Sequence, residues 1–146
     1  MDTGLSLKKG EISDLEYVLF RLKKMALKSN INFKHSATLI NKNFLCAGFN
    51  KPIIIKHKIN KSIHAEVDAL CNYPFKKQIK GMDMIVIRVN KNNELRNSRP
   101  CNDCIFSLNK RGVRKIIYSN EYGNLVYEFV KDMPKLHACS SSLQKI

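Results

Sequence analysis

The stretches HAEVDALC, at residues 64–71, and PCNDC, at residues 100–104, each mark the start of a predicted helix. The proline of the second stretch fixes a backbone angle suited to helix entry. Cys101 and Cys104 then occupy positions i and i+3, so both sulfur atoms lie on one face of that helix. His64 opens the other helix, which is expected to end before the next proline. The starts of two helices therefore carry one imidazole and two thiols.

These three side chains form a ligand set for Zn²⁺. A helix N-terminus favours thiolate over thiol, because its free N–H groups and its dipole stabilise an anion. Three protein ligands leave one tetrahedral position open for water, which is typical of a catalytic zinc site. We therefore predict that His64, Cys101 and Cys104 bind Zn²⁺. Glu66 lies two residues from His64 and is close enough to move protons without binding the metal.

The spacing of apolar residues predicts the remaining elements. Helices are expected over residues 13–29, 64–71 and 101–110. Strands are expected over residues 35–41, 44–49, 82–89, 113–119 and 125–130, with a loop over residues 51–62. A short turn, NEYG, joins the last two strands, so this C-terminal pair is expected to be antiparallel. The order predicts an α/β chain with a five-stranded mixed sheet and helices on both faces.

Length and composition favour one intracellular globular domain. The chain has 146 residues, 44% of them hydrophobic, which fits a single domain over residues 1–146 with a core at about 13–130. We find no secretory signal and no apolar run of membrane-spanning length, so we expect a cytoplasmic protein without a membrane partner. The odd number of cysteines, five, favours metal binding over a disulfide framework.

The net charge of +14 has two interpretations. It indicates a polyanionic partner such as nucleic acid. It also fits an AT-rich genome, because 20 of the 26 basic residues are Lys and only 6 are Arg, the better phosphate ligand. Both interpretations stay open.

The motif H-A-E, followed after 33 residues by P-C-x-x-C, resembles the signature of the zinc-dependent cytidine, deoxycytidylate and tRNA-adenosine deaminase superfamily. The similarity covers about residues 13–130. It implies the three-layer α/β/α cytidine-deaminase-like fold, the zinc ligands predicted above, and Glu66 as the catalytic acid and base. It also implies that the backbone N–H groups of Ala65 and Cys101 bind the substrate beside the base.

Weaker matches concern the substrate. The segment G-F-N-K-P at residues 48–52 resembles a G-[WY]-N-x-P segment of tRNA adenosine deaminases, which implies that Asn50 contacts the sugar. Phe33 and His35 precede it and are candidates for stacking on a base. Arg99 stands where the tRNA adenosine enzymes carry Glu, and those enzymes have a long final helix in place of the predicted strand pair. Free-cytidine deaminases usually have Cys in place of His64.

The sequence therefore predicts a hydrolase acting on a C–N bond of a cyclic amidine. The leading hypothesis is zinc-dependent deamination of cytosine in a nucleoside or nucleotide, with Glu66 moving protons to N3 and to the leaving ammonia. Arg99 is a candidate for contact with a phosphate. One alternative is a deaminase acting on bases in single-stranded RNA, DNA or tRNA, and another is an inactive, zinc-stabilised binding module. The resemblance also implies a homodimer or homotetramer.

Overall fold

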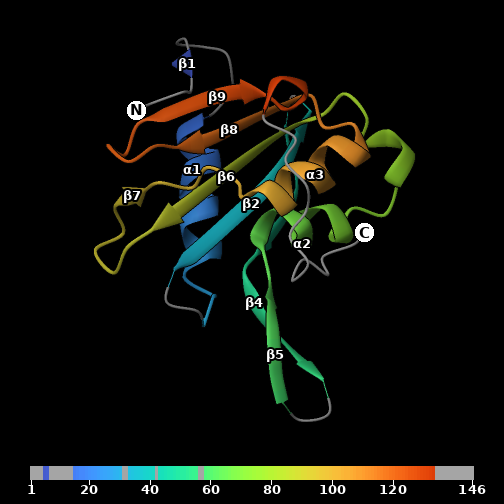
Figure 1. The fold of residues 1–146 in the computed structure, drawn as a ribbon. Helices are drawn as coiled ribbons and strands as arrows, with labels where there is room; N and C mark the ends of the chain where they lie inside the picture. The colour runs from blue at the N-terminus through green and yellow to red at the C-terminus, as the bar shows by residue number, and fades with distance from the viewer. Residues whose placement is uncertain (1–4, 7–14, 31–32, 42, 56–57, 134–146) are drawn as a thin grey trace.

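The computed structural model describes residues 5–6, 15–30, 33–41, 43–55 and 58–133. Its helices are α1 (Leu15–Ala26), α2 (Ala65–Asn72) and α3 (Asn102–Arg111), with short 3₁₀ helices η1 (Lys76–Gln78) and η2 (Val130–Asp132). Its strands are β1 (Leu5–Ser6), β2 (Lys34–Asn41), β3 (Asn43–Phe49), β4 (Lys51–Ile55), β5 (Lys58–Ile63), β6 (Asp83–Val89), β7 (Leu95–Arg96), β8 (Lys115–Ser119) and β9 (Leu125–Phe129). Figure 1 shows their arrangement.

The main sheet is mixed, as predicted. Its strand order is β1-β9-β8-β6-β2-β3, and β7 pairs with β6 to make seven strands. The pair β6–β8 is parallel, whereas β8 and β9 form the predicted antiparallel C-terminal pair. All five predicted strands are present. The two additional strands, β1 and β7, are only two residues long, which is too short to give a periodic pattern.

Helices cover both faces of the sheet, which gives the expected three layers (Figure 1). On one face, Leu22 of α1 packs in a buried cluster with Ile85 and Ile87 of β6. On the other face, Met84 and Val86 of β6 belong to the cluster that contains α2 and α3. Strand β6 is apolar on both faces because helices cover both, as is usual for central strands of α/β proteins. No helix among the described residues combines the length and apolar character needed to cross a membrane.

Residues 51–55 and 58–63 form a separate two-stranded sheet, and the loop predicted over 51–62 is therefore wrong. Strands β4 and β5 pair antiparallel from Lys51↔Ile63 to Ile55↔Lys58. This pair extends away from the main sheet as an arm (Figure 1). The consecutive isoleucines of this segment favour a strand. The lysines among them leave no regular alternation of apolar and polar residues, so the sequence did not indicate strands here. Residues 13–14 of the first predicted helix and the chain after residue 133 lie outside the described residues.

Candidate metal and substrate site

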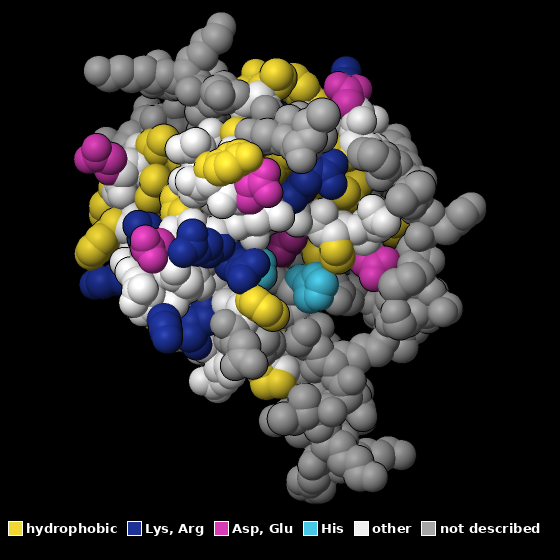
Figure 2. Space-filling view, turned by 60° about the vertical axis from the view of Figure 1, so that its left-hand side comes forward, with side chains coloured by type: hydrophobic (Ala, Val, Ile, Leu, Met, Phe, Trp, Pro, Cys, Tyr) yellow, Lys and Arg dark blue, Asp and Glu magenta, His cyan; other side chains and the backbone are white. Residues whose placement is uncertain are grey.

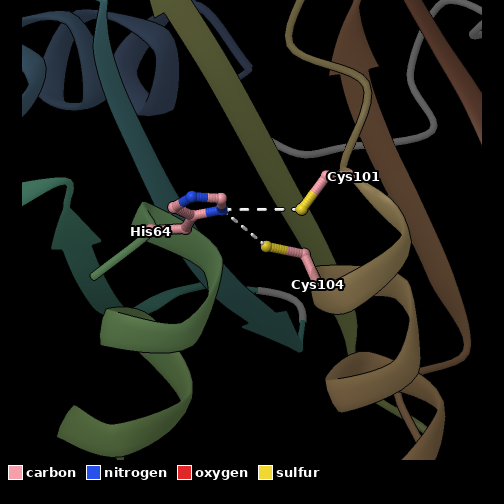
Figure 3. A group of neighbouring side chains, drawn as sticks. All are labelled: His64, Cys101 and Cys104. Atoms are coloured by element: carbon pink, nitrogen blue, oxygen red, sulfur yellow. Dashed lines mark hydrogen bonds between the residues drawn. The ribbon is translucent and has the colours of Figure 1, made fainter. Parts of the chain in front are cut away.

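The structure brings the three predicted metal ligands together. His64 is the N-cap of α2, Cys101 is the N-cap of α3, and Cys104 lies in the first turn of α3. The His64 Nδ1 atom is 3.2 Å from the Sγ of Cys104 and 3.6 Å from the Sγ of Cys101. Figure 3 shows the imidazole of α2 facing both sulfur atoms across the gap between the two helices. The ligand atoms all lie within 4.8 Å of one another, an arrangement compatible with a metal site.

The two thiols differ in their electrostatic environment. Hydrogen bonds from the Cys104 thiol and from His64 lower the pKa of Cys101 to about 4. The same hydrogen bond to Cys101, together with burial, raises the pKa of Cys104 well above its usual value. The hydrogen bond to Cys101 also raises the pKa of His64. Binding of a cation by both sulfur atoms requires both as thiolates, so it would release protons from this cluster.

Glu66 lies next to this cluster, in the first turn of α2. Its side chain is buried, with 4% of its surface exposed. Burial is the main cause that raises the pKa of Glu66 above its ordinary value. A carboxyl group with a raised pKa is better suited to both accept and donate a proton near neutral pH. Burial in a cleft beside potential metal ligands is also typical of a functional rather than a solvated carboxyl.

A cavity of about 250 Å³ opens beside the cluster. This volume is close to the lower end for ligand pockets and suits a small ring rather than a large ligand. Among the residues that line the cavity are all the predicted site residues except Cys104. The lining residues are Phe33, His35, Asn50, His64, Ala65, Glu66, Ser98, Arg99 and Cys101.

Asn50 lies at the cavity, but both ends of its amide are engaged by the protein. Its Oδ1 accepts a hydrogen bond of 2.9 Å from the backbone N–H of His35. Its Nδ2 donates a hydrogen bond to the backbone oxygen of Phe33. The amide therefore joins the end of β3 to the start of β2 and fixes the two residues predicted to stack on a base. Contact between Asn50 and a sugar stays a prediction.

Arg99 also lines the cavity, and its guanidinium group forms a fork with a carboxylate. Its Nε and Nη2 atoms lie 2.8 Å and 3.3 Å from the two carboxylate oxygens of Glu128 in β9. The hydroxyl of Tyr118 donates a 2.6 Å hydrogen bond to the same carboxylate. The charge that we expected to meet a phosphate is thus balanced within the protein. Glu128 was missed, although an acidic residue inside the apolar stretch LVYEFV is a signal for a paired carboxylate.

A second missed residue, Asp68, holds the end of β3 against α2. Its buried carboxylate accepts a hydrogen bond of 3.1 Å from the backbone N–H of Phe49 and lies 3.1 Å from the Nζ of Lys51. Close contact at Gly48 supports this placement, because a Cβ atom there would lie 2.5 Å from the backbone nitrogen of Ala69. Asn50 is thereby positioned beside the first turn of α2. The signal in the sequence was an aspartate two residues after Glu66, among the apolar residues of α2.

A three-layer α/β/α chain with a His-Cys-Cys cluster at the starts of two helices has the architecture of the cytidine-deaminase-like proteins. Solved structures agree. A dCMP deaminase from the cyanophage S-TIM5 matches with a TM-score of 0.55 and 23% identity, over 73% of this chain and 82% of that chain. Cytidine deaminase from Burkholderia pseudomallei matches with a TM-score of 0.62 and 17% identity, over 81% and 94%. Cytidine deaminase from Mycobacterium tuberculosis matches with a TM-score of 0.53 and 14% identity, over 82% and 92%.

These likenesses show that the chain has the cytidine-deaminase-like fold predicted from its motifs. At these identities they establish the fold alone. No protein-family profile and no curated protein sequence matches the chain. The reaction and its substrate are therefore inferred from the site itself.

Proposed function

We propose that the protein is a zinc-dependent hydrolase that deaminates cytosine in a nucleoside or nucleotide. The observation that carries this proposal is the position of Glu66, buried at a small cavity and adjacent to His64, Cys101 and Cys104. A purely structural metal site has no use for a buried carboxyl at this place. The solved structures with the same fold, named as dCMP and cytidine deaminases, support the same reaction type.

The donor set and its spacing fit zinc. Zinc–sulfur bonds of about 2.3 Å and zinc–nitrogen bonds of about 2.0 Å place tetrahedral N and S ligands about 3.5 Å apart. The distances from His64 Nδ1 to the two sulfur atoms are 3.2 Å and 3.6 Å. His64, Cys101 and Cys104 would hold the ion, and two thiolates with one imidazole are donors that zinc favours. Bound zinc would supply a polarised water molecule of lowered pKa.

In this proposal the residues of the chain hold the base and move its protons. Glu66 accepts a proton from water and donates it to N3 of the ring, while the water oxygen forms a bond to C4. It then transfers the second proton to the amino group, which leaves as ammonia when the C4–N bond breaks. The backbone N–H groups of Ala65 and Cys101 stand at helix starts, where such donors have no partner within the helix, and are proposed to bind the base.

Two features favour cytosine over adenine. The antiparallel pair β8–β9 stands where the tRNA adenosine deaminases carry a long final helix, and Arg99 replaces their glutamate. The homodimer or homotetramer, the cytoplasmic location and the single domain over residues 1–146 remain predictions that accompany this proposal.

The test is an activity panel on protein with measured zinc content. The substrates are cytidine, deoxycytidine, their monophosphates, adenosine, guanine and short oligonucleotides, with products identified by mass. We expect conversion of at least one cytosine compound to the uracil product, and loss of that activity when a chelator removes the metal. Stoichiometric zinc without turnover of any of these compounds would instead support the inactive binding module. Exclusive conversion of adenosine would overturn the assignment to cytosine.

A further inference from the structure

Two arginines, Arg88 and Arg96, lie on neighbouring strands in register with the cavity residue His35. In the sheet register, Arg88 of β6 lies opposite His35 of β2 on one side and opposite Arg96 of β7 on the other. Directly opposed residues point to the same face of a sheet. Along β6, Met84, Val86 and Arg88 are two residues apart and therefore point to the same face. Met84 and Val86 pack against α2 and α3, so this is the face that carries the pocket. Figure 2 shows Lys and Arg side chains gathered beside the histidines on this surface.

Arg88 and Arg99 differ in their acidic neighbours within the described part of the chain. Among the described residues, Arg88 forms no ion pair, whereas Arg99 is held by Glu128. Its neighbour Arg96 lies 3.7 Å from the exposed Glu94. Two like charges directly opposite each other in a sheet destabilise it. A bound anion would remove that repulsion.

The surroundings of Arg88 also suit a nucleotide. Its guanidinium carbon lies 4.4 Å from the centroid of the Phe33 ring. Phe33 lines the cavity and has 58% of its surface exposed. An aromatic ring next to a guanidinium group is the combination that binds bases and phosphates of single-stranded nucleic acids. Both groups stand at the edge of the cavity proposed to take the base.

The composition of the chain supports the same interpretation. Lysine is abundant in this sequence, and an AT-rich genome is one of the two explanations of that abundance. Arginine is scarce, with 6 in the chain, yet Arg99 lines the cavity, Arg88 lies opposite the cavity residue His35, and Arg96 lies opposite Arg88. Arginine presents a planar fork that matches a phosphate. Three of the six arginines thus lie at the cavity or on the strands beside it. This clustering supports an anion-binding site there, whereas the net charge of the chain alone does not.

We propose that Arg88, next to Phe33, binds a phosphate ester of the substrate while its base occupies the cavity. This inference rests on the proposed deaminase function and names its substrate class as phosphate-bearing rather than a free nucleoside. The phosphate belongs either to a mononucleotide or to the backbone of a single-stranded nucleic acid, since both present the same group to the guanidinium. Arg96 adds a second positive charge one strand further from the cavity.

Binding measurements on zinc-loaded protein test the site without depending on turnover. A fluorescein-labelled single-stranded oligonucleotide with one cytosine serves as the probe, and unlabelled dCMP and deoxycytidine compete with it. We compare wild type with Arg88→Gln and with Lys131→Gln, a matched loss of one exposed positive charge on η2. Loss of a hydrogen-bonded ionic contact weakens binding by about tenfold or more. Loss of a phosphate contact also lowers the salt slope by about 0.7.

We expect Arg88→Gln to weaken the phosphate-bearing ligands selectively and Lys131→Gln to leave them unchanged. Weaker binding of both dCMP and the oligonucleotide identifies the 5′-phosphate, and weaker binding of the oligonucleotide alone identifies the backbone phosphate. Equal losses for deoxycytidine and dCMP, no loss for either phosphate-bearing ligand, or an equal loss in Lys131→Gln would overturn the proposal. Catalysis is scored separately: selective binding without deamination would reject the proposed reaction and keep the phosphate site.

Discussion

The cavity has two sides that are built in different ways. On the metal side, His64, Glu66, Cys101 and Cys104 stand at the first turns of α2 and α3, and their side chains face one another. The opposite side, which we call the entry side, is lined by Phe33, His35, Asn50 and Arg99. These residues come from strand ends and from the segment before α3, and both Asn50 and Arg99 form hydrogen bonds with other parts of the protein.

In our proposal, the metal side carries out the reaction and the entry side binds the substrate. Groups on short, rigid helix starts keep a fixed geometry, which is what a catalytic centre requires. On the entry side, the amide of Asn50 instead joins the ends of β2 and β3, and the guanidinium of Arg99 binds Glu128 of β9. In our proposal, Arg88 and Phe33 are the groups on this side that select the substrate. Variants on the metal side should therefore remove the reaction, whereas variants on the entry side should change stability or affinity.

The largest effect is expected for Cys104→Ser. This change replaces a buried thiol of the cluster with a hydroxyl, which is a poorer zinc ligand. We expect loss of stoichiometric zinc and of all measurable deamination, checked by metal analysis and by the cytosine panel. Cys71→Ser is the matched control, because Cys71 is exposed on α2 and lies outside the cluster. Full zinc content in Cys104→Ser would contradict the ligand assignment.

The next largest effect is expected for Glu66→Gln. The amide keeps the size of the side chain but cannot accept and return a proton. Removing a general acid and base lowers kcat by about 10²–10⁴-fold. Zinc content should stay unchanged, since Glu66 is not a ligand in this proposal. Glu121→Gln, in the exposed turn between β8 and β9, is the control. Wild-type turnover in zinc-loaded Glu66→Gln would exclude the proton-transfer role.

Asp68→Ala should affect stability and affinity more than the rate of the chemical step. It leaves the backbone N–H of Phe49 without its carboxylate acceptor and removes the ion pair with Lys51. An unsatisfied buried donor costs about 1–3 kcal/mol of unfolding free energy. We also expect a higher KM, because Asn50 lies between these two residues. Denaturant unfolding and steady-state kinetics measure both effects, with the exposed Asp132→Ala as control. An unchanged KM would mean that Asp68 does not position the entry side.

The two sides also differ in how far the sequence predicts them. Helix geometry alone relates Cys101 to Cys104, and α3 ends locally at Gly112, whose φ of 81° suits glycine. Contacts on the entry side join residues far apart in the chain, such as Arg99 and Glu128, which are 29 positions apart. Local spacing carries no information on such a pair. The arm was missed because lysines interrupt its apolar residues, so its sequence shows no regular alternation.

The smallest effect is expected for Glu128→Gln. It removes the charge that holds Arg99, whose side chain is 29% exposed while that of Glu128 is 15% exposed. A partly exposed ion pair of this kind is worth about 1 kcal/mol at most, so we expect a small decrease in unfolding free energy. If Arg88 rather than Arg99 binds the phosphate, the KM for dCMP should change by less than about twofold. A large increase in KM would show that the Arg99–Glu128 pair orders the entry side, and a large decrease would show that a freed Arg99 is itself able to bind phosphate.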